Sequence, residues 1–235
     1  MRVSIVIPVF DEEAHVGELL RRVLACDVER EGFEREILLC DDGSTDGTAA
    51  ALEDAARSVP GLRLFSHPRN LGKGAAIRTL LSHATGDCVL VQDADLEYET
   101  DDSPALLRAF ANGHDAVYGS RFLATRWPLG MRPAHLVANR VLTRTANALY
   151  GHRLTDEATC LKLVRTNLLR NMNLRCQRFD FCPEVTAKLG RMGVRIHEVP
   201  VRYRARSAAS GKKIAWHDGV EALDALLMHR RWTPP

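Results

Sequence analysis

The sequence predicts an α/β fold in which a mostly parallel central sheet is flanked by helices and followed by a helix-rich C-terminal half. Within residues 1–120, short apolar runs alternate with amphipathic stretches of helical period, which is the pattern of βαβ units. Beyond Arg121 helical periods dominate, and no long linker or internal repeat separates the halves. Residues 1–235 are therefore expected to form one domain.

The elements follow in order along the chain. Five runs predict strands: Val3–Val9, Glu36–Cys40, Leu62–Ser66, Cys88–Gln92 and Ala116–Tyr118. Apolar residues at helical spacing predict helices between them: Ala14–Ala25, Thr48–Ser58, Ala75–Ala84 and Pro104–Ala111. In the second half, helices are predicted at Pro133–Tyr150, Pro183–Leu189 and Trp216–Arg231, with a strand-like Val194–Tyr203 before the last of them.

Charge is distributed unevenly along an otherwise ordinary globular composition. Of the 235 residues 46% are hydrophobic and 26% charged, yet residues 1–120 hold 11 Lys+Arg against 22 Asp+Glu, whereas residues 121–235 hold 21 against 8. The basic residues are scattered through amphipathic elements, and the spacings of zinc fingers, RNP motifs and basic zippers are missing. We therefore expect no nucleic-acid partner.

The cysteines and the N-terminal apolar run predict a cytoplasmic protein. None of the six cysteines belongs to a C-x-x-C pair, and most lie beside apolar residues, as reduced core cysteines do. The run Val3–Val9 is short and meets acidic residues, so it predicts a strand and not a signal peptide. No stretch approaches the roughly 20 apolar residues of a membrane-spanning helix.

An acidic triplet follows the fourth predicted strand. Asp93-Ala94-Asp95 comes directly after Val89–Val91, and side chains at positions i and i+2 of an extended segment point to the same side. Two such carboxylates suit Mg²⁺ or Mn²⁺ when substrate phosphates complete the coordination. A solvated acidic loop is the plainer alternative, but the position at a strand end favours a metal site.

Two further strand ends carry glycines with polar residues. Asp41 or Asp42, before Gly43, could accept hydrogen bonds from a ribose or a base N–H, or could merely cap a turn. Lys73 within Asn70–Gly74 suggests a phosphate loop near a helix N-terminus. His67 and Gly74 violate the Walker pattern, so an ATPase is not expected.

Cations in the second half suit phosphate. Arg121 follows the fifth predicted strand, and Arg206 and Lys212 flank a segment that contains Gly and Ser. Arginine provides bidentate contacts to phosphate, and lysine provides a point charge. For each of these cations, a solvated basic loop is an equally good interpretation. The nine histidines form no metal-ligand pattern, and no Gly-x-Ser-x-Gly motif indicates a hydrolase.

Taken in order, these motifs resemble the family 2 glycosyltransferases with the GT-A (Rossmann-like) fold. The branch they resemble most contains dolichol-phosphate mannosyltransferases and polyprenyl-phosphate glycosyltransferases. The resemblance covers nearly the whole chain, except that Asp11 replaces the usual Asn after the aromatic residue. The residues that carry it are Ile7–Glu12, Asp41–Ser44, Asn70–Gly74, Asp93–Asp95, Gly119–Phe122 and Glu198–Val201.

The resemblance implies a metal-dependent, inverting transfer of sugar from a GDP- or UDP-linked donor to a polyprenyl phosphate, dolichyl or undecaprenyl. Residues 1–120 would form the nucleotide-sugar-binding half and residues 121–235 the acceptor side. The implied donor-binding residues are Pro8, Val9, Phe10, Glu12, Asp41, Asp42, Lys73, Asp93, Ala94 and Asp95. Asp93 and Asp95 would hold Mg²⁺ or Mn²⁺, and Arg121, Arg206 and Lys212 would bind phosphate. The implied catalytic residues are Asp95, Arg121, Asp156 and Glu157.

Two alternatives remain open from the sequence. A family 2 enzyme that acts on a soluble hydroxyl or saccharide would need a general base, with Asp156 or Glu157 the candidates, whereas a phosphate acceptor is already an anion. A non-catalytic nucleotide-sugar-binding protein would keep the pocket without turnover. The presence of Asp93 and Asp95 disfavours this second alternative.

The last predicted helix bears on location. Trp216, Val220, Leu223 and Leu227 recur at helical spacing and are expected to pack on the domain. The following His229–Trp232 segment suits an anionic membrane surface instead. The sequence thus predicts a cytoplasmic protein, with peripheral contact at the cytoplasmic face of a membrane as the alternative.

Overall fold

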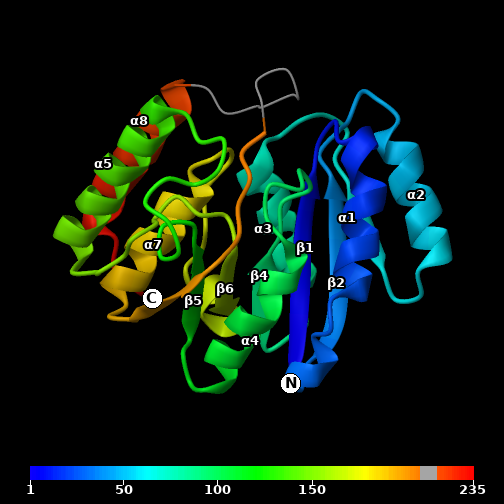
Figure 1. The fold of residues 1–235 in the computed structure, drawn as a ribbon, viewed down its shortest axis with the longest axis horizontal. Helices are drawn as coiled ribbons and strands as arrows, with labels where there is room; N and C mark the ends of the chain where they lie inside the picture. The colour runs from blue at the N-terminus through cyan, green and yellow to red at the C-terminus, as the bar shows by residue number, and fades with distance from the viewer. Residues whose placement is uncertain (207–215) are drawn as a thin grey trace.

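The computed structural model describes residues 1–206 and 216–235, with side chains for 1–206 and 218–235. Its centre is one seven-stranded sheet of order β3-β2-β1-β4-β6-β5-β7, covered by helices on both faces (Figure 1). The strands are β1 Arg2–Val9, β2 Glu34–Asp41, β3 Arg63–Ser66, β4 Cys88–Val91, β5 Ala116–Ser120, β6 Lys162–Arg165 and β7 Ile196–Pro200. The helices are α1 Glu13–Ala25, α2 Thr48–Ser58, α3 Lys73–His83, α4 Ser103–Ala111, α5 Pro133–Tyr150, α6 Thr166–Asn171, α7 Phe181–Arg191 and α8 Trp216–Met228.

The predicted fold class is confirmed. Strand β1 pairs in parallel with β2 and β4, β2 with β3, and β5 with β7, while β6 runs antiparallel to both of its neighbours. Because β1, β2 and β4 point the same way, the acidic residues that follow them meet at one edge of the sheet. This is the edge where ligands bind in open α/β sheets.

Strand β6 and helix α6 were not predicted, and β6 completes the sheet. Its first residue, Lys162, is a poor strand signal because a lysine is rarely buried. Here its ammonium donates to the carbonyl oxygen of Glu157 at 2.8 Å and lies 3.4 Å from the centre of the Tyr118 ring. These contacts replace water, so the lysine is only 1% exposed inside a central strand.

Three other predictions need correction. The strand-like Val194–Tyr203 forms a strand only over Ile196–Pro200, and Tyr203 makes an isolated bridge with Tyr98. Pro183 stands third in α7 and not first. The last helix ends at Met228, after which His229–Arg231 form a 3₁₀ turn.

Apolar side chains from the two sheet faces form separate cores. On one face Ile5 and Leu90 pack with residues of α1, α2 and α4, such as Leu19. On the other face Val6 packs with residues of α3, α6 and α7, such as Val185. The alternation of Ile5 and Val6 along β1 shows why its run is continuously apolar: both faces of the strand are covered.

Helices α5 and α8 form an outer layer over α7 (Figure 1). Leu142 of α5 and Ala222 and Leu226 of α8 are buried against Ala187 of α7, so α7 lies between this layer and the sheet. Every residue of Phe181–Leu189 is accordingly buried.

The predicted packing of the last helix is wrong for two of its residues. Val220 and Leu227 are 57% and 51% exposed, because α8 buries the neighbouring face that carries Ala222 and Leu226. Leu223 is partly buried against that cluster. Trp232 packs back on α7, where its ring lies 5.3 Å from the ammonium of Lys188.

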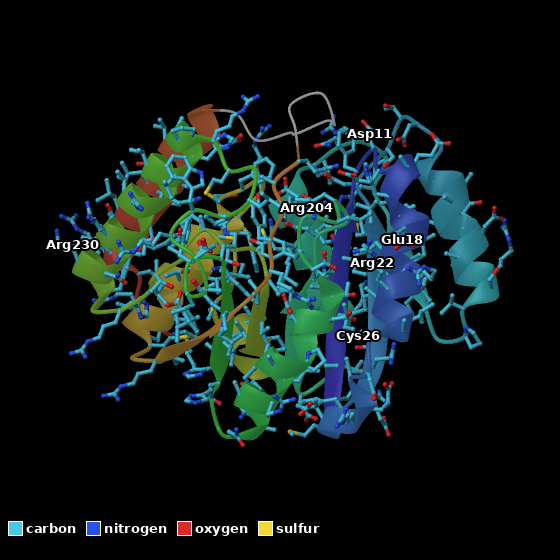
Figure 2. All side chains as sticks on the ribbon, viewed as in Figure 1. Asp11, Glu18, Arg22, Cys26, Arg204 and Arg230 are labelled. Carbon is cyan, nitrogen blue, oxygen red and sulfur yellow. The ribbon has the colours of Figure 1, made fainter. Side chains whose placement is uncertain are left out.

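The two sequence halves of opposite charge balance lie on different sides of the molecule, with α1 and α2 on one side and α5 and α8 on the other (Figure 1). Figure 2 shows Arg230 at the outer edge of the α5–α8 layer, on the opposite side of the molecule from Glu18 of α1. In the part of the chain that the structure describes, no helix is both long and apolar enough to cross a membrane.

Candidate active site

A cavity of about 650 Å³ opens at the carboxyl ends of the strands. Its polar part is lined by residues that follow β1 and β4, including Glu12, Asp93 and Asp95. Its other part is mainly apolar and lies between α7, which contributes Phe181, and the α5–α8 layer, which contributes Ala134, Ala138, Leu142 and Ala222. The cavity therefore joins a charged compartment to an apolar one.

The acidic triplet lies in the polar part. The ammonium of Lys73 lies 2.5 Å from the Asp93 carboxylate. Leu96 has φ 59°, an uncommon conformation for a non-glycine residue, and this turn lets the Glu97 amide donate to Asp95 at 3.1 Å. Burial, followed by the charges of Asp93 and Glu97, raises the pKa of Asp95 to about 7. Loss of water and the neighbouring carboxylates thus both disfavour the ionised form of Asp95.

Residues Val201–Arg206, which follow β7, run past the acidic triplet. Glu97 holds this segment, because its carboxylate accepts hydrogen bonds from the Tyr203 hydroxyl at 2.6 Å and the Arg206 amide at 2.7 Å. Glu97 is not among the site residues predicted from the sequence. Its i+2 spacing from Asp95 could have identified it, because it continues the alternation that begins at Asp93.

Arg206 is one of two predicted phosphate ligands that line the cavity in the described part of the chain. Its guanidinium donates twice to the Glu12 carboxylate, at 2.9 and 3.0 Å, and lies 3.5 Å from Asp95. Two residues of the predicted donor site therefore share one cation. Lys212, the other phosphate ligand predicted in this region, lies outside the described residues.

Arg121 also lines the cavity, and a buried carboxylate holds it in place. Its Nε and Nη2 atoms each lie 2.6 Å from an oxygen of Asp156, whose side chain is 0% exposed. The guanidinium faces the ring of Tyr203 at 5.1 Å. Asp156 is not among the described residues that line the cavity, so this pair presents the cation and not the carboxylate.

Glu157 reaches the cavity, unlike its neighbour Asp156. Its side chain is fully buried, and within the described structure neither carboxylate oxygen has a hydrogen-bond partner within 3.5 Å. Burial raises the pKa of Glu157, and the ammonium of Lys162 partly opposes this shift. A buried carboxyl group of this kind is costly for the fold, which is a mark of a functional residue.

The two aspartates after β2 serve the loop that contains Lys73. Asp42 lines the cavity, but its oxygens already accept hydrogen bonds from the Leu71 and Gly72 amides and bind His67 at 2.6 Å. Asp41 accepts from the Ser44 amide at 3.0 Å and is not a described lining residue. The turn-forming alternative therefore accounts for the contacts of both residues.

The loop before α3 explains why the phosphate-loop pattern fails. The Gly74 and Ala75 amides donate to the carbonyl oxygens of Arg178 and Gln177, each at 3.0 Å. Gly72 has φ 97°, and a Cβ there would collide with the Gln177 carbonyl oxygen. The first amides of α3 are thus bound to backbone, where a nucleotide phosphate would otherwise bind.

Asp11 takes a backbone conformation and makes contacts that the usual Asn of the resembled family could also make. Its φ of 46° lies in the left-handed region, which Asn and Asp tolerate better than other non-glycine residues. Its carboxylate accepts from the Thr45 amide at 2.7 Å and its own amide donates to Ser44 at 3.0 Å. Either residue could therefore connect the loops after β1 and β2.

The comparison with protein families decides the assignment. The family model described as glycosyl transferase family 2 matches residues 4–172, which is more than half of the chain. The chain belongs to glycosyl transferase family 2. The resemblance seen in the sequence motifs is thereby confirmed.

Relatives of this glycosyltransferase include two curated bacterial enzymes, both called undecaprenyl-phosphate 4-deoxy-4-formamido-L-arabinose transferase. The enzyme from Enterobacter sp. (strain 638) is 33% identical over 214 residues, and that from Edwardsiella ictaluri (strain 93-146) is 34% identical over 214 residues. The alignments cover 90% and 89% of this chain. The chain spans only 62% of the length of either relative.

Solved structures support the fold of this glycosyltransferase. Glucosyl-3-phosphoglycerate synthase from Mycobacterium tuberculosis in complex with uridine diphosphate has a TM-score of 0.71 at 20% identity, covering 100% of this chain and 81% of that one. The same synthase with Mn²⁺, uridine diphosphate and phosphoglyceric acid has a TM-score of 0.69 at 19% identity, covering 100% and 80%. At this identity the similarity concerns the fold alone.

Proposed function

We propose that the chain is a metal-dependent, inverting glycosyltransferase that moves a sugar from a nucleotide-diphosphate sugar to a polyprenyl phosphate. The observation that carries the proposal is the cavity that joins an acidic and cationic compartment to an apolar one. The charged compartment would bind the nucleotide sugar, and the apolar compartment would bind the isoprenoid chain of the acceptor. The curated relatives named for transfer to undecaprenyl phosphate support the same acceptor class.

The donor would lie at the ends of β1 and β4. Pro8, Phe10 and Glu12 form the wall beside the acidic triplet and would contact the nucleoside. Asp41 and Asp42 would meet the same nucleoside, and Asp42, which also holds the Lys73 loop, lines the cavity. The predicted donor is linked to either GDP or UDP.

The acidic triplet fits a divalent cation. Asp93 and Asp95 offer the hard oxygen ligands that Mg²⁺ and Mn²⁺ prefer, and both line the same cavity. Among described residues, no three His, Cys, Asp or Glu side chains form a cage that could hold an ion. Asp93 and Asp95 would thus hold the metal together with substrate phosphates. When bound, it would neutralise charge on the leaving diphosphate.

The acceptor phosphate would meet the fixed cations of the cavity. Arg121 is held rigidly by Asp156, and Arg206 is held across the acidic triplet by Glu12 and Glu97. A phosphate oxygen is already anionic, so it can attack the anomeric carbon without a strong base once it is positioned. A single displacement of the nucleoside diphosphate inverts the anomeric configuration.

The apolar compartment would receive the first isoprene units. Ala134, Ala138 and Ala222 are small, so they leave space between α5 and α8 beside Leu142. The outer faces of the two helices carry exposed Val137 and Val220, 59% and 57% exposed. We propose that this layer makes peripheral contact with an anionic membrane, at its cytoplasmic face, through the exposed arginines Arg140, Arg144, Arg230 and Arg231.

Glu157 is the observation that favours a second function. Of the two candidate bases, Asp156 and Glu157, it is Glu157 that lines the cavity. Its raised pKa suits a base that removes a proton from a hydroxyl. If the acceptor is a soluble alcohol or saccharide, Glu157 is the general base. With a phosphate acceptor, Glu157 in its protonated form would donate a hydrogen bond to that phosphate.

The test is turnover by the purified chain with UDP- and GDP-linked sugars, Mn²⁺, and undecaprenyl phosphate in detergent. We expect a glycosyl phosphoryl lipid by mass spectrometry and nucleoside diphosphate released in equal amount. Asp95→Ala should abolish both products, whereas Asp54→Ala on the exposed side of α2 should not. Glycosylation of soluble alcohols only would establish the second function, and no diphosphate release with any donor would indicate a binding protein.

A further inference from the structure

Two of the six cysteines line the cavity. Cys160 lies just before β6 and Cys182 in the first turn of α7, and both are free thiols. Neither has a part in the proposed transfer. Their position beside the donor compartment therefore calls for an explanation of its own.

The two thiols and one ammonium group meet at the same place. The Sγ atom of Cys182 lies 3.3 Å from the carbonyl oxygen of Thr159, the residue before Cys160. The Sγ atom of Cys160 lies 3.0 Å from Nζ of Lys73. Both cysteines pack against the same apolar core, so the surrounding residues keep them together.

The surroundings favour a thiolate at Cys182 and a protonated thiol at Cys160, whose pKa is raised by its pairing with Cys182 and by burial. The hydrogen bond from Cys160, together with the ammonium groups of Lys162 and Lys73, lowers the pKa of Cys182. The first turn of a helix also stabilises negative charge. By contrast, burial raises the pKa of Cys40 and Cys88 to about 12.

We propose that Cys160 and Cys182 form a dithiol modification site in the cavity wall, which a two-electron oxidant of the peroxide class closes to a disulfide. The Cys182 thiolate attacks one peroxide oxygen, the O–O bond breaks, and hydroxide leaves, so that sulfur becomes a sulfenic acid. The sulfur of Cys160 then displaces the sulfenic oxygen, which leaves as water with the thiol proton. Two thiols and one peroxide yield one disulfide and two waters.

The disulfide would alter the donor compartment through Lys73. The ammonium that contacts Cys160 is also the partner of Asp93, so a bond between the two sulfurs removes a contact that positions Lys73. Oxidation should therefore weaken donor turnover, a consequence that rests on the proposed function. Reduction of the disulfide by a thiol reverses the change.

The test is peptide mapping of the full chain after treatment with hydrogen peroxide, digested without reductant. We expect one cross-linked peptide pair, Cys160 with Cys182, that disappears on treatment with dithiothreitol. Cys160→Ser and Cys182→Ser should each abolish the cross-link. Cys26→Ser is the matched control, because its hydroxyl can keep the bond of Cys26 to the Thr100 carbonyl, and the cross-link should persist.

The outcomes separate this proposal from the proposed function. A different cysteine pairing, or oxygen adducts on Cys160 or Cys182 without a cross-link, would overturn the proposal. Donor turnover by the reduced chain tests the proposed function alone. If that turnover exists, peroxide should lower it, because Lys73 loses the contact with the Cys160 sulfur that helps to position it. It should recover with dithiothreitol, and unchanged turnover in the cross-linked chain would refute the link through Lys73.

Discussion

Asp156→Asn should destabilise the protein, because Asp156 neutralises a buried cation. Both guanidinium contacts to Arg121 are 2.6 Å long, and the two side chains are 8% and 0% exposed. Removing one partner of a buried ion pair costs about 3–5 kcal/mol. The amide keeps the shape of the carboxylate, so we expect a loss of about 3 kcal/mol in the free energy of unfolding. For a chain of this length, that lowers the unfolding midpoint by roughly 6–12 °C.

The same substitution at an exposed pair provides the control. Asp115 lies 2.5 Å from Arg165, with side chains 47% and 38% exposed, so Asp115→Asn should cost at most about 1 kcal/mol. Calorimetry and urea denaturation of both variants measure the difference. Replacing both members of the buried pair, Arg121→Met with Asp156→Leu, should recover most of the lost stability but not the turnover.

One result would refute this reasoning. If Asp156→Asn keeps the unfolding midpoint of the parent chain and loses all turnover, Asp156 acts directly on the substrate and does not serve mainly to hold Arg121. A loss of stability with residual turnover agrees with a positioning role.

Three further predictions follow from other parts of the molecule. Gly72→Ala should cost at least about 2 kcal/mol, measured by urea denaturation, because a Cβ there meets the Gln177 carbonyl and the positive φ is strained; an unchanged midpoint would mean that the loop can rearrange. Burial raises the pKa of Glu157, so the native state binds its proton more tightly than the unfolded chain, and stability should fall as pH rises from about 4.5 through the native pKa. Glu157→Gln should remove that fall and raise the unfolding midpoint at neutral pH; a lower midpoint would contradict the assignment. Val220→Ser with Leu227→Ser should leave the midpoint nearly unchanged, because both side chains are more than half exposed, but should reduce salt-sensitive co-sedimentation with anionic vesicles. No binding of the parent chain at low salt would exclude the membrane contact.

The position of the acidic residues at one edge of the sheet could be predicted from local sequence patterns. Apolar runs at Val3–Val9 and Cys88–Gln92 predicted two parallel strands, and the residues after them lie together because parallel strands end at one edge. The placement of Asp93, Asp95 and Glu12 in one cavity follows from that rule.

Contacts between distant segments decided the roles of individual residues. Asp42 was expected to meet a nucleoside, and the fold gives it a further role, because amides 29 and 30 positions later donate to its oxygens. Asp156 and Glu157 are neighbours with the same chemistry, and only the fold turns one toward Arg121 and the other toward the cavity. No local signal distinguishes the members of such pairs.

The sequence alone determined the family, the order of strands and helices in the first half, and the edge of the sheet where the acidic residues meet. These features depend on local periodicity and on motifs that are contiguous in the chain. Tertiary structure alone decided that Lys162 could be buried in β6, which face of α8 packs inward, and that Cys160 and Cys182 lie together. The reason is that burial and partner choice depend on groups far away in the chain, and a side chain's own neighbours in sequence do not specify them.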